Sequence, residues 1–98
     1  LGMILVHNGI VRATSKQGKS VERMKLSYDH VMLDQALRRF RNMEGIVDVR
    51  AWINEGLLKV GDDIMYVCVA GRFRKDILPV FQELIALIKT EIVREEEL

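Results

Sequence analysis

Residues 64–70, Ile-Met-Tyr-Val-Cys-Val-Ala, form an almost wholly apolar run in this 98-residue chain. A run without a polar face predicts a strand at the centre of a sheet, covered on both sides. Gly61 and Asp62 stand just before it and predict a tight turn, preceded by a short strand over residues 57–60. The other elements are therefore expected to pack around residues 64–70.

An amphipathic helix is predicted after the central run. Its apolar side chains recur at helical spacing, while Glu83 and Lys89 fall outside the apolar stripe. Pro79 is tolerated only near the first turn of a helix, which predicts a start around Asp76. The stripe consists of Ile77, Phe81, Leu84, Ile88 and Ile92. This helix should bury that stripe against the sheet.

Earlier segments complete the expected secondary structure. Residues 33–40 have helical spacing, with Asp29 as the candidate N-cap and Gly45 as the stop. Several strand links are too short for parallel crossovers, so the sequence predicts an α+β fold with helices on one face of a mainly antiparallel sheet. The remaining predicted strands lie within residues 3–14, 21–28 and 47–52, with a polar loop at 15–20.

Composition excludes several functional classes. The 98 residues predict a single domain, and 15 Lys and Arg against 14 Asp and Glu give a net charge of +1. Such a balance provides no overall field for nucleic acid or an anionic membrane. Cys68, the single cysteine, cannot form an internal disulfide, and no apolar run approaches the roughly 20 residues that span a bilayer. We expect a cytoplasmic protein that binds neither nucleic acid nor membrane.

The sequence also predicts that a few residues at each end of the chain lie outside the folded domain. Leu1 and Gly2 precede Met3, the expected natural start, and are predicted to be a remnant outside the fold. The acidic segment at residues 95–98 is predicted to be a frayed tail. The domain is otherwise expected to cover the whole of residues 1–98.

Most chemical signatures are missing from the chain. His7 and His30 have no Cys, His or carboxylate at metal-ligand spacing, so no metal site and no cofactor are expected. The glycines are isolated, which excludes a phosphate-binding loop, and no nucleophile elbow occurs. A solvated helix face is favoured over a nucleic-acid interface for three arginines without interleaved aromatic residues. They are Arg38, Arg39 and Arg41.

Cationic side chains near the ends of elements remain as candidates. Arg72, Arg74 and Lys75 precede a helix N-terminus, where backbone N–H groups and the helix dipole favour an anion such as phosphate. Arg12 lies late in the first strand, and its guanidinium group matches phosphate oxygens. Lys89, if partly desolvated, can act as a nucleophile or base. Composition alone leaves an anion-binding site and ordinary surface charge equally open.

Three short motifs occur in a recognisable order. They are Gly-Ile-Val-Arg at residues 9–12, Leu-Ser-Tyr-Asp at 26–29 and Gly-Leu-Leu-Lys-Val-Gly-Asp at 56–62. With the apolar strand and the lysine-bearing helix that follow, they resemble the large, catalytic subunit of molybdopterin synthase. That enzyme adds two sulfur atoms to a cyclic pyranopterin phosphate in molybdenum-cofactor biosynthesis. The resemblance covers about residues 4–94, and the family has Glu where this chain has Asp29 and Asp62.

The resemblance implies a fold, partners and residue roles. The fold would be α/β-hammerhead-like, and the partners a second large subunit in a homodimer and a small ubiquitin-like sulfur-carrier subunit. The carrier's thiocarboxylated Gly-Gly tail would enter a pocket that also holds the pterin phosphate substrate. Arg12 and Arg74 would bind anions, and Lys89 would act through a covalent link to the tail or through proton transfer. These three residues are expected to converge on one concave site.

The chain also departs from the family at expected site positions. Phe73 replaces the histidine of the family's His-Arg pair, and the family's second lysine position falls on Glu96, whose charge should repel an anionic pterin. Arg94 is the candidate substitute for that lysine. Two functions therefore stay open: sulfur transfer, and a non-catalytic module of the same fold that binds a carrier or an anionic ligand. A third alternative is an α+β domain that is unrelated to pterins.

Overall fold

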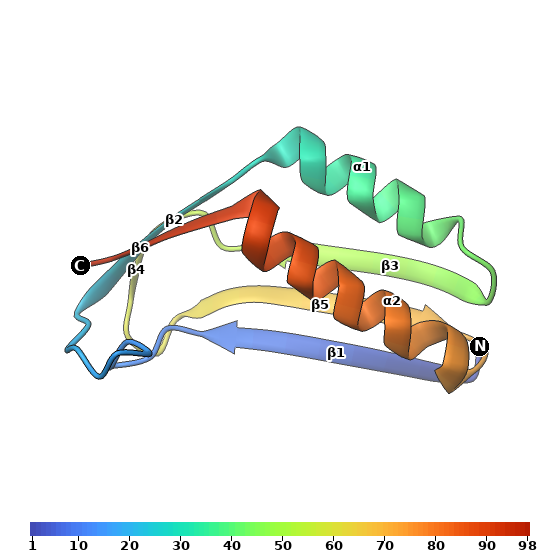
Figure 1. The fold of residues 1–98 in the computed structure, drawn as a ribbon, viewed down its shortest axis with the longest axis horizontal. Helices are drawn as coiled ribbons and strands as arrows, with labels where there is room; N and C mark the ends of the chain where they lie inside the picture. Colours follow the sequence, from blue (N-terminus) through green and yellow to red (C-terminus); the bar gives the residue numbers. More distant parts are fainter.

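A three-stranded antiparallel sheet runs along most of the molecule and carries both helices on one face (Figure 1). The structure, a computed structural model, describes residues 1–98 and has extents of 42 × 24 × 19 Å. The strand order of this long sheet is β1-β5-β3, with α1 and α2 lying over it. The bounds are β1 (Met3–Ile10), β3 (Ile46–Ile53), β5 (Asp63–Gly71), α1 (His30–Arg41) and α2 (Arg74–Leu87).

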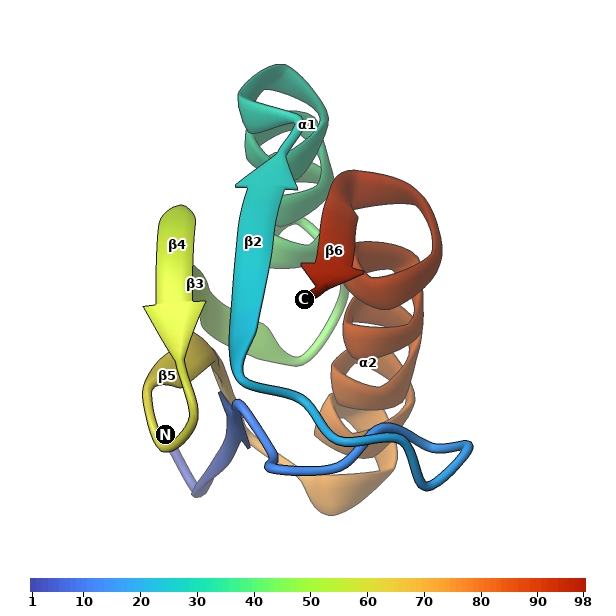
Figure 2. The ribbon, with the colours of Figure 1, turned by 90° about the vertical axis from the view of Figure 1, so that its left-hand side faces the viewer.

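A second, shorter antiparallel sheet stands at one end of the long sheet. Figure 2 shows it from that end, with the order β4-β2-β6 and with β6 following directly from the last helix. Its strands are β2 (Arg23–Tyr28), β4 (Gly56–Lys59) and β6 (Val93–Glu97). The arrangement confirms the predicted α+β class with a mainly antiparallel sheet. No helix is long and apolar enough to cross a membrane.

α1 begins where the sequence predicts. Asp29 is its N-cap, and the carboxylate accepts a hydrogen bond of 2.9 Å from the Met32 backbone N–H. The helix ends at Arg41, before the predicted stop at Gly45, which instead has a φ of +81° in the turn into β3. The buried face of α1 consists of Leu33, Ala36, Leu37 and Phe40.

α2 begins earlier than predicted. It starts at Arg74, not near Asp76, so Pro79 lies in the helix interior. Proline lacks the N–H that would bond to the Lys75 carbonyl. Both residues are exposed, so water can replace the missing hydrogen bond there.

β5 is the central strand, as predicted, but only one of its faces is covered. Val67 and Val69 are fully buried under the helices, whereas Tyr66 is 42% exposed on the opposite face and Cys68 is half-buried. Both helices lie on the same side of the long sheet, with α1 leading into β3 and α2 following β5 (Figure 1). The predicted coverage on both sides is therefore wrong within one chain.

The uncovered side of the long sheet, called here the open face, is largely apolar. Trp52 stacks on Tyr66 with ring centroids 5.4 Å apart, and strand register places Val6 opposite Cys68. The large exposed apolar side chains of the open face are Ile4, Val6, Trp52 and Tyr66. An apolar surface of this kind marks an interaction site more often than plain surface.

The acidic segment at residues 95–98 was predicted to fray, but the structure holds it in place. β6 pairs with β2, and the Leu98 N–H donates a hydrogen bond of 2.8 Å to the Arg23 carbonyl. Backbone pairing therefore holds this acidic segment in a strand. At the other end of the chain, the Gly2 N–H donates a hydrogen bond of 2.8 Å to the Gly71 carbonyl, so Gly2 takes part in the long sheet.

Candidate functional site

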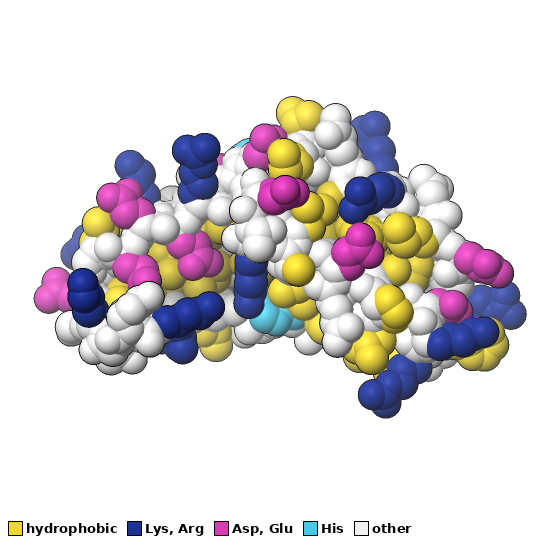
Figure 3. Space-filling model, viewed as in Figure 1, with side chains coloured by type: hydrophobic (Ala, Val, Ile, Leu, Met, Phe, Trp, Pro, Cys, Tyr) yellow, Lys and Arg dark blue, Asp and Glu magenta, His cyan; other side chains and the backbone are white.

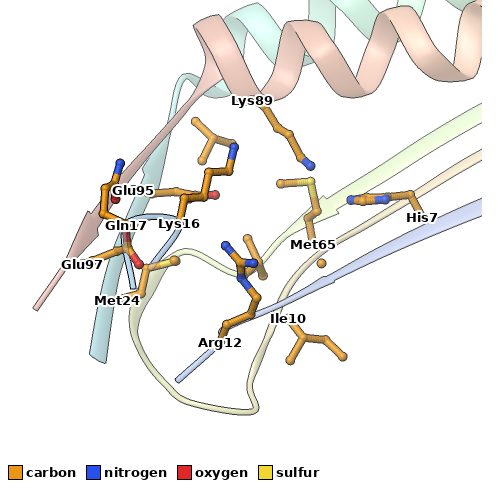
Figure 4. Close-up of a pocket in the computed structure, with 13 residues that line it drawn as sticks. His7, Ile10, Arg12, Lys16, Gln17, Met24, Met65, Lys89, Glu95 and Glu97 are labelled. Carbon is orange, nitrogen blue, oxygen red and sulfur yellow. The ribbon is translucent and has the colours of Figure 1, made fainter. Parts of the chain in front are cut away.

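A cavity of about 640 Å³ lies where the long sheet meets the shorter sheet, and we call it the junction cavity (Figure 4). Its walls come from β1, the loop after β1, the start of β5, the end of the last helix and β6. Figure 3 shows basic side chains gathered beside a histidine on this part of the surface. The charged and titratable residues that line the cavity are His7, Arg12, Lys16, Lys89, Glu95 and Glu97.

β1 directs two residues into the junction cavity. Alternate residues of a strand face opposite sides, and His7 and Gly9 fall on the inner side of β1, paired with Val67 and Met65. Gly9 leaves a carbon-sized space beside the imidazole, since a Cβ there would be in ordinary van der Waals contact with His7 Nε2, at 3.7 Å. The first sequence motif thus supplies, through Gly9, the room next to the imidazole of His7, which precedes the motif by two residues.

Two of the sequence motifs are joined by backbone hydrogen bonds at the cavity rim. The Val11 N–H donates to the Asp62 carbonyl and the Gly61 N–H donates to the Val11 carbonyl, both at 2.9 Å. Val11 is buried, which fixes the neighbouring Arg12 with its side chain toward the cavity (Figure 4). The turn between β4 and β5 therefore positions Arg12.

Lys89 reaches the cavity from a widened helical turn. The last helix ends in a π-helical segment, Ile88–Ile92, in which both terminal isoleucines are buried. Lys89 lies between them on the exposed side and extends toward Met65 and His7 (Figure 4). π-Helical turns recur at functional sites, where they reposition a side chain.

His7 is electrostatically unusual. Its Nε2 atom is buried and has no hydrogen-bond partner. Burial and, secondly, the positive charge of Lys89 hold the pKa of His7 below its ordinary value. The imidazole is therefore neutral at neutral pH and has an unused polar atom facing the cavity wall.

The cations of the junction cavity are not neutralised by ion pairs. Arg12, Lys16 and Lys89 form none of the salt bridges of the structure, which join other residues. Glu95 and Glu97 add negative charge on the β6 side. The arrangement can bind an anion through three free cationic groups. No group of three or more His, Cys, Asp and Glu side chains could hold a metal ion.

The predicted site residues fall into separate groups. Arg12 and Lys89 line the same cavity, as expected. Arg74 does not join them, because it stands at the other end of the last helix, roughly 20 Å away at a rise of about 1.5 Å per residue. Arg72 and Lys75 are also at that far end, over the ring of Phe73. The prediction that Arg12, Arg74 and Lys89 converge on one site is therefore wrong within one chain.

β6 also divides the predicted residues. Arg94 and Glu96 line a smaller hollow of about 330 Å³ with Lys25, Ser27 and Glu95, and of these residues Glu95 alone also lines the junction cavity. Strand alternation is the cause, since it turns neighbouring side chains to opposite faces. Arg94 thus does not replace a cavity lysine in this structure, and the charge of Glu96 does not enter the cavity.

Four cavity residues were missed by the sequence reasoning. Lys16 lies in a polar loop and carried no pattern, and Glu95 and Glu97 were expected to fray. His7 was considered only as a metal ligand. Its alternation with Gly9 in the first motif was the available signal, because it places both on one face of the strand.

Comparisons with known proteins agree with this fold. A family model described as MoaE protein matches residues 1–91. The structure is similar to molybdopterin synthase from Staphylococcus aureus, with a TM-score of 0.82 and 22% identity over 99% of this chain and 74% of that chain. No curated protein sequence matches significantly.

Two further solved structures are similar. One is the complex of subunits 1 and 2 of molybdopterin-converting factor from Helicobacter pylori, with a TM-score of 0.78 and 16% identity over 98% of this chain and 65% of that chain. The other is molybdopterin cofactor biosynthesis protein E from Burkholderia multivorans, with a TM-score of 0.73 and 24% identity over 99% of this chain and 69% of that chain. The chain spans about two thirds to three quarters of these structures, and the likeness establishes the fold.

Proposed function

The chain belongs to the MoaE protein family, and we propose that it acts in molybdenum-cofactor biosynthesis as the large subunit of a molybdopterin synthase. In this role it transfers sulfur from a small carrier protein to a cyclic pyranopterin phosphate. The observation that carries the proposal is that Arg12 and Lys89, from distant parts of the sequence, line one cavity.

The charge and size of the junction cavity support a pterin phosphate as the substrate. Pockets for small molecules are typically about 300–1,000 Å³, and the cavity volume is about 640 Å³. Arg12 would bind the phosphate, with a guanidinium geometry that suits two oxygens at once. Lys89 would stand beside the reacting part of the ligand.

A small carrier subunit is the proposed sulfur donor. The Helicobacter pylori structure is a complex of subunits 1 and 2 of the converting factor, which supports such a partner for this chain. The carrier tail would enter the junction cavity and reach Lys89. Lys89 would then form a covalent link to the tail or transfer a proton, and mass spectrometry of the reaction mixture distinguishes these two roles.

Reconstitution tests the proposed activity. The purified protein is mixed with a thiocarboxylated carrier and the precursor pterin, and dithiolene product is measured. We expect Lys89→Ala to lower the rate at least about 100-fold, the usual scale for a lost acid, base or nucleophile, and Arg12→Ala to raise KM. Lys25→Ala is the matched control, because Lys25 is exposed on β2 and lines only the smaller hollow.

A non-catalytic binding module is the second candidate. Glu95 and Glu97 bring negative charge to the cavity, and Phe73 stands where the family has a histidine. Carrier binding without product in the reconstitution would establish this module and refute turnover. Absence of both binding and product would refute both functions.

A homodimer is the proposed assembly. The open face, with exposed Val6, Trp52 and Tyr66, supports it because a second copy could bury this apolar surface. A two-fold axis that reverses the strand direction would also bring Arg74 of one copy toward the junction cavity of the other. That geometry would reconcile the implied role of Arg74 with its position at the far end of α2.

The proposed compartment is the cytoplasm. The unpaired Cys68 supports it, because a reducing environment keeps a half-buried thiol free. Fractionation of cells that produce the protein checks this assignment.

A further inference from the structure

We propose that His7 contacts the bound ligand through Nε2, binding its oxyanion and taking up one proton from solvent as the ligand enters the junction cavity. This inference deepens the proposed function and rests on the same site. It assigns a ligand contact to a residue of β1 for which neither the sequence motifs nor the family resemblance implies a role.

The first argument is the unsatisfied Nε2 atom. Buried polar atoms nearly always have a hydrogen-bond partner, and each exception calls for an explanation. His7 Nε2 is buried without one, although its residue lines a cavity that is open to solvent. A ligand atom in the cavity would supply the missing partner.

The second argument is access to the imidazole. Figure 4 shows the His7 ring directed toward the space below Lys89. Nothing larger than hydrogen stands at Gly9, and the nearest neighbours of a Cβ there would be Ile64, Met65 and Nε2 itself, at 3.6–3.7 Å. Nε2 is itself covered in this arrangement, and the space at Gly9 leaves the ring room to turn Nε2 toward a ligand in the cavity.

The third argument is the set of charges around the ring. Lys89 approaches from the last helix, Arg12 and Lys16 from the loop after β1, and Glu95 and Glu97 from β6, while the adjoining part of β5 presents apolar Ile64 and Met65. His7 has no carboxylate partner in any salt bridge of the structure. Its neighbours therefore favour the neutral ring until an anion arrives.

Binding of an anion reverses that balance. An oxyanion between Lys89 and His7 offsets the repulsion from Lys89, and it favours the protonated ring through an opposite charge and a hydrogen bond. The reaction is balanced as neutral imidazole plus a solvent proton plus the anion, giving an imidazolium–anion pair. Affinity should therefore rise as the pH falls toward the pKa of His7 in the free protein.

Two ligands of the proposed enzyme carry such an oxyanion, namely the phosphate of the pterin and the carboxylate end of the carrier tail. Sulfate is the probe for the first, because it is a tetrahedral dianion that does not titrate between pH 5 and 8. Glycylglycine is the probe for the second. Sodium chloride at matched ionic strength is the blank.

The experiment follows both imidazole rings by NMR as the pH is changed, with and without each probe, and measures the pKa of His7. We expect sulfate to raise the pKa of His7 by about one unit, the scale for an opposite charge close by. His30 is the internal control, since it stacks on Tyr28 and contacts Glu55 away from the cavity. At a given pH, its ring resonances should be the same with and without each probe.

Two variants separate ligand contact from folding. His7→Gln keeps a polar side chain but cannot titrate, so sulfate affinity should lose its rise at low pH. Gly9→Ala keeps the imidazole but adds a methyl group close to Nε2, and it should weaken sulfate binding while the strand persists. Circular dichroism of both variants checks that the fold is retained.

The outcomes are distinct. A shift of His7 with sulfate assigns the phosphate contact, and a shift with glycylglycine alone assigns the carrier tail; both support contact with a ligand oxyanion. A His7 pKa that is unchanged with both probes overturns the inference, even if a probe binds elsewhere in the cavity. Absence of product in the wild-type reconstitution would refute sulfur transfer but would not affect the His7 result. Failure of the proposed function is therefore distinguishable from failure of the His7 inference.

Discussion

At the scale of single residues, the junction cavity depends on side chains from the two ends of the sequence. His7 and Arg12 come from the first strand and its following loop, and Lys89 comes from the last helical turn. The burial of Val11 and Ile88 holds the neighbouring Arg12 and Lys89 in place. Apolar anchors therefore determine where the charged groups point.

The lowered pKa of His7 has a consequence for stability. Between the ordinary histidine pKa, about 6.5, and the lower pKa of the folded state, the unfolded chain binds more protons than the folded chain. The free energy of unfolding should therefore decrease as the pH falls through this window. Urea unfolding of the wild type at pH 8 and pH 5.5 measures the decrease.

Two variants test whether His7 causes this decrease in the free energy of unfolding. His7→Gln should reduce the difference in unfolding free energy between pH 8 and pH 5.5, whereas Gln17→Ala, at an exposed position without a titratable group, should leave it nearly unchanged. An equal pH dependence in wild type and His7→Gln would contradict the assignment to His7.

Sequence reasoning located only part of the site, for reasons visible in individual residues. Arg12 and Lys89 were identified because they belong to or follow quoted motifs. Arg74 was misplaced because sequence order does not reveal which end of a long helix faces a cavity. Arg94 was misassigned because a strand, unlike the expected frayed tail, turns consecutive side chains to opposite faces.

At the scale of elements, periodicity predicted where the helices and strands lie better than it predicted which of their side chains are buried. The spacing of Leu33, Leu37 and Phe40 gave a true buried face for α1. Val47 and Val49 stand two residues apart in the strand predicted within residues 47–52, a spacing that places both on one face, yet Val47 is 55% exposed because a register irregularity between β3 and β5 falls there. Such irregularities depend on the neighbouring strand and leave no mark in the local sequence.

The start of α1 provides a test at this scale. Asp29→Ala removes the carboxylate that caps the Met32 N–H. We expect the free energy of unfolding to fall by about 0.5–2 kcal/mol, the usual effect of losing an N-cap. Chemical denaturation measures this change.

Asp34→Ala is the control for the cap. Asp34 is exposed on the same helix and makes no side-chain hydrogen bond or salt bridge in the structure. A loss in Asp34→Ala as large as that in Asp29→Ala would show that helix charge, and not the cap, causes the effect.

At the scale of the whole molecule, the open face and the far position of Arg74 are the main surprises. The sequence of an apolar central strand does not reveal whether its second face is covered within the chain, because burial by a helix and burial by another copy select the same residues. The proposed homodimer accounts for both observations.

The dimer leads to a prediction about mass and activity. Val6→Glu places a charge on the open face, where Val6 is 63% exposed, so it should reduce the mass measured by light scattering to that of one chain of 11.3 kDa. Lys16→Glu, in the loop after β1, should leave the mass unchanged. A monomeric wild type would refute the homodimer.

Complementation tests the orientation of the two copies. Arg74→Ala and Lys89→Ala should each lose most activity alone, and a mixture of the two should regain up to about a quarter of wild-type activity, because mixed dimers carry one intact site. No recovery after subunit exchange would mean that Arg74 does not serve the partner's cavity.

The pairing of β6 with β2 has a consequence during synthesis of the protein. Glu95 and Glu97, which close one side of the junction cavity, pair with a strand made about 70 residues earlier. Until β6 has left the ribosome, a nascent polypeptide has no complete hollow in which to trap a small molecule. Ligand capture can therefore begin only after translation has passed the final strand.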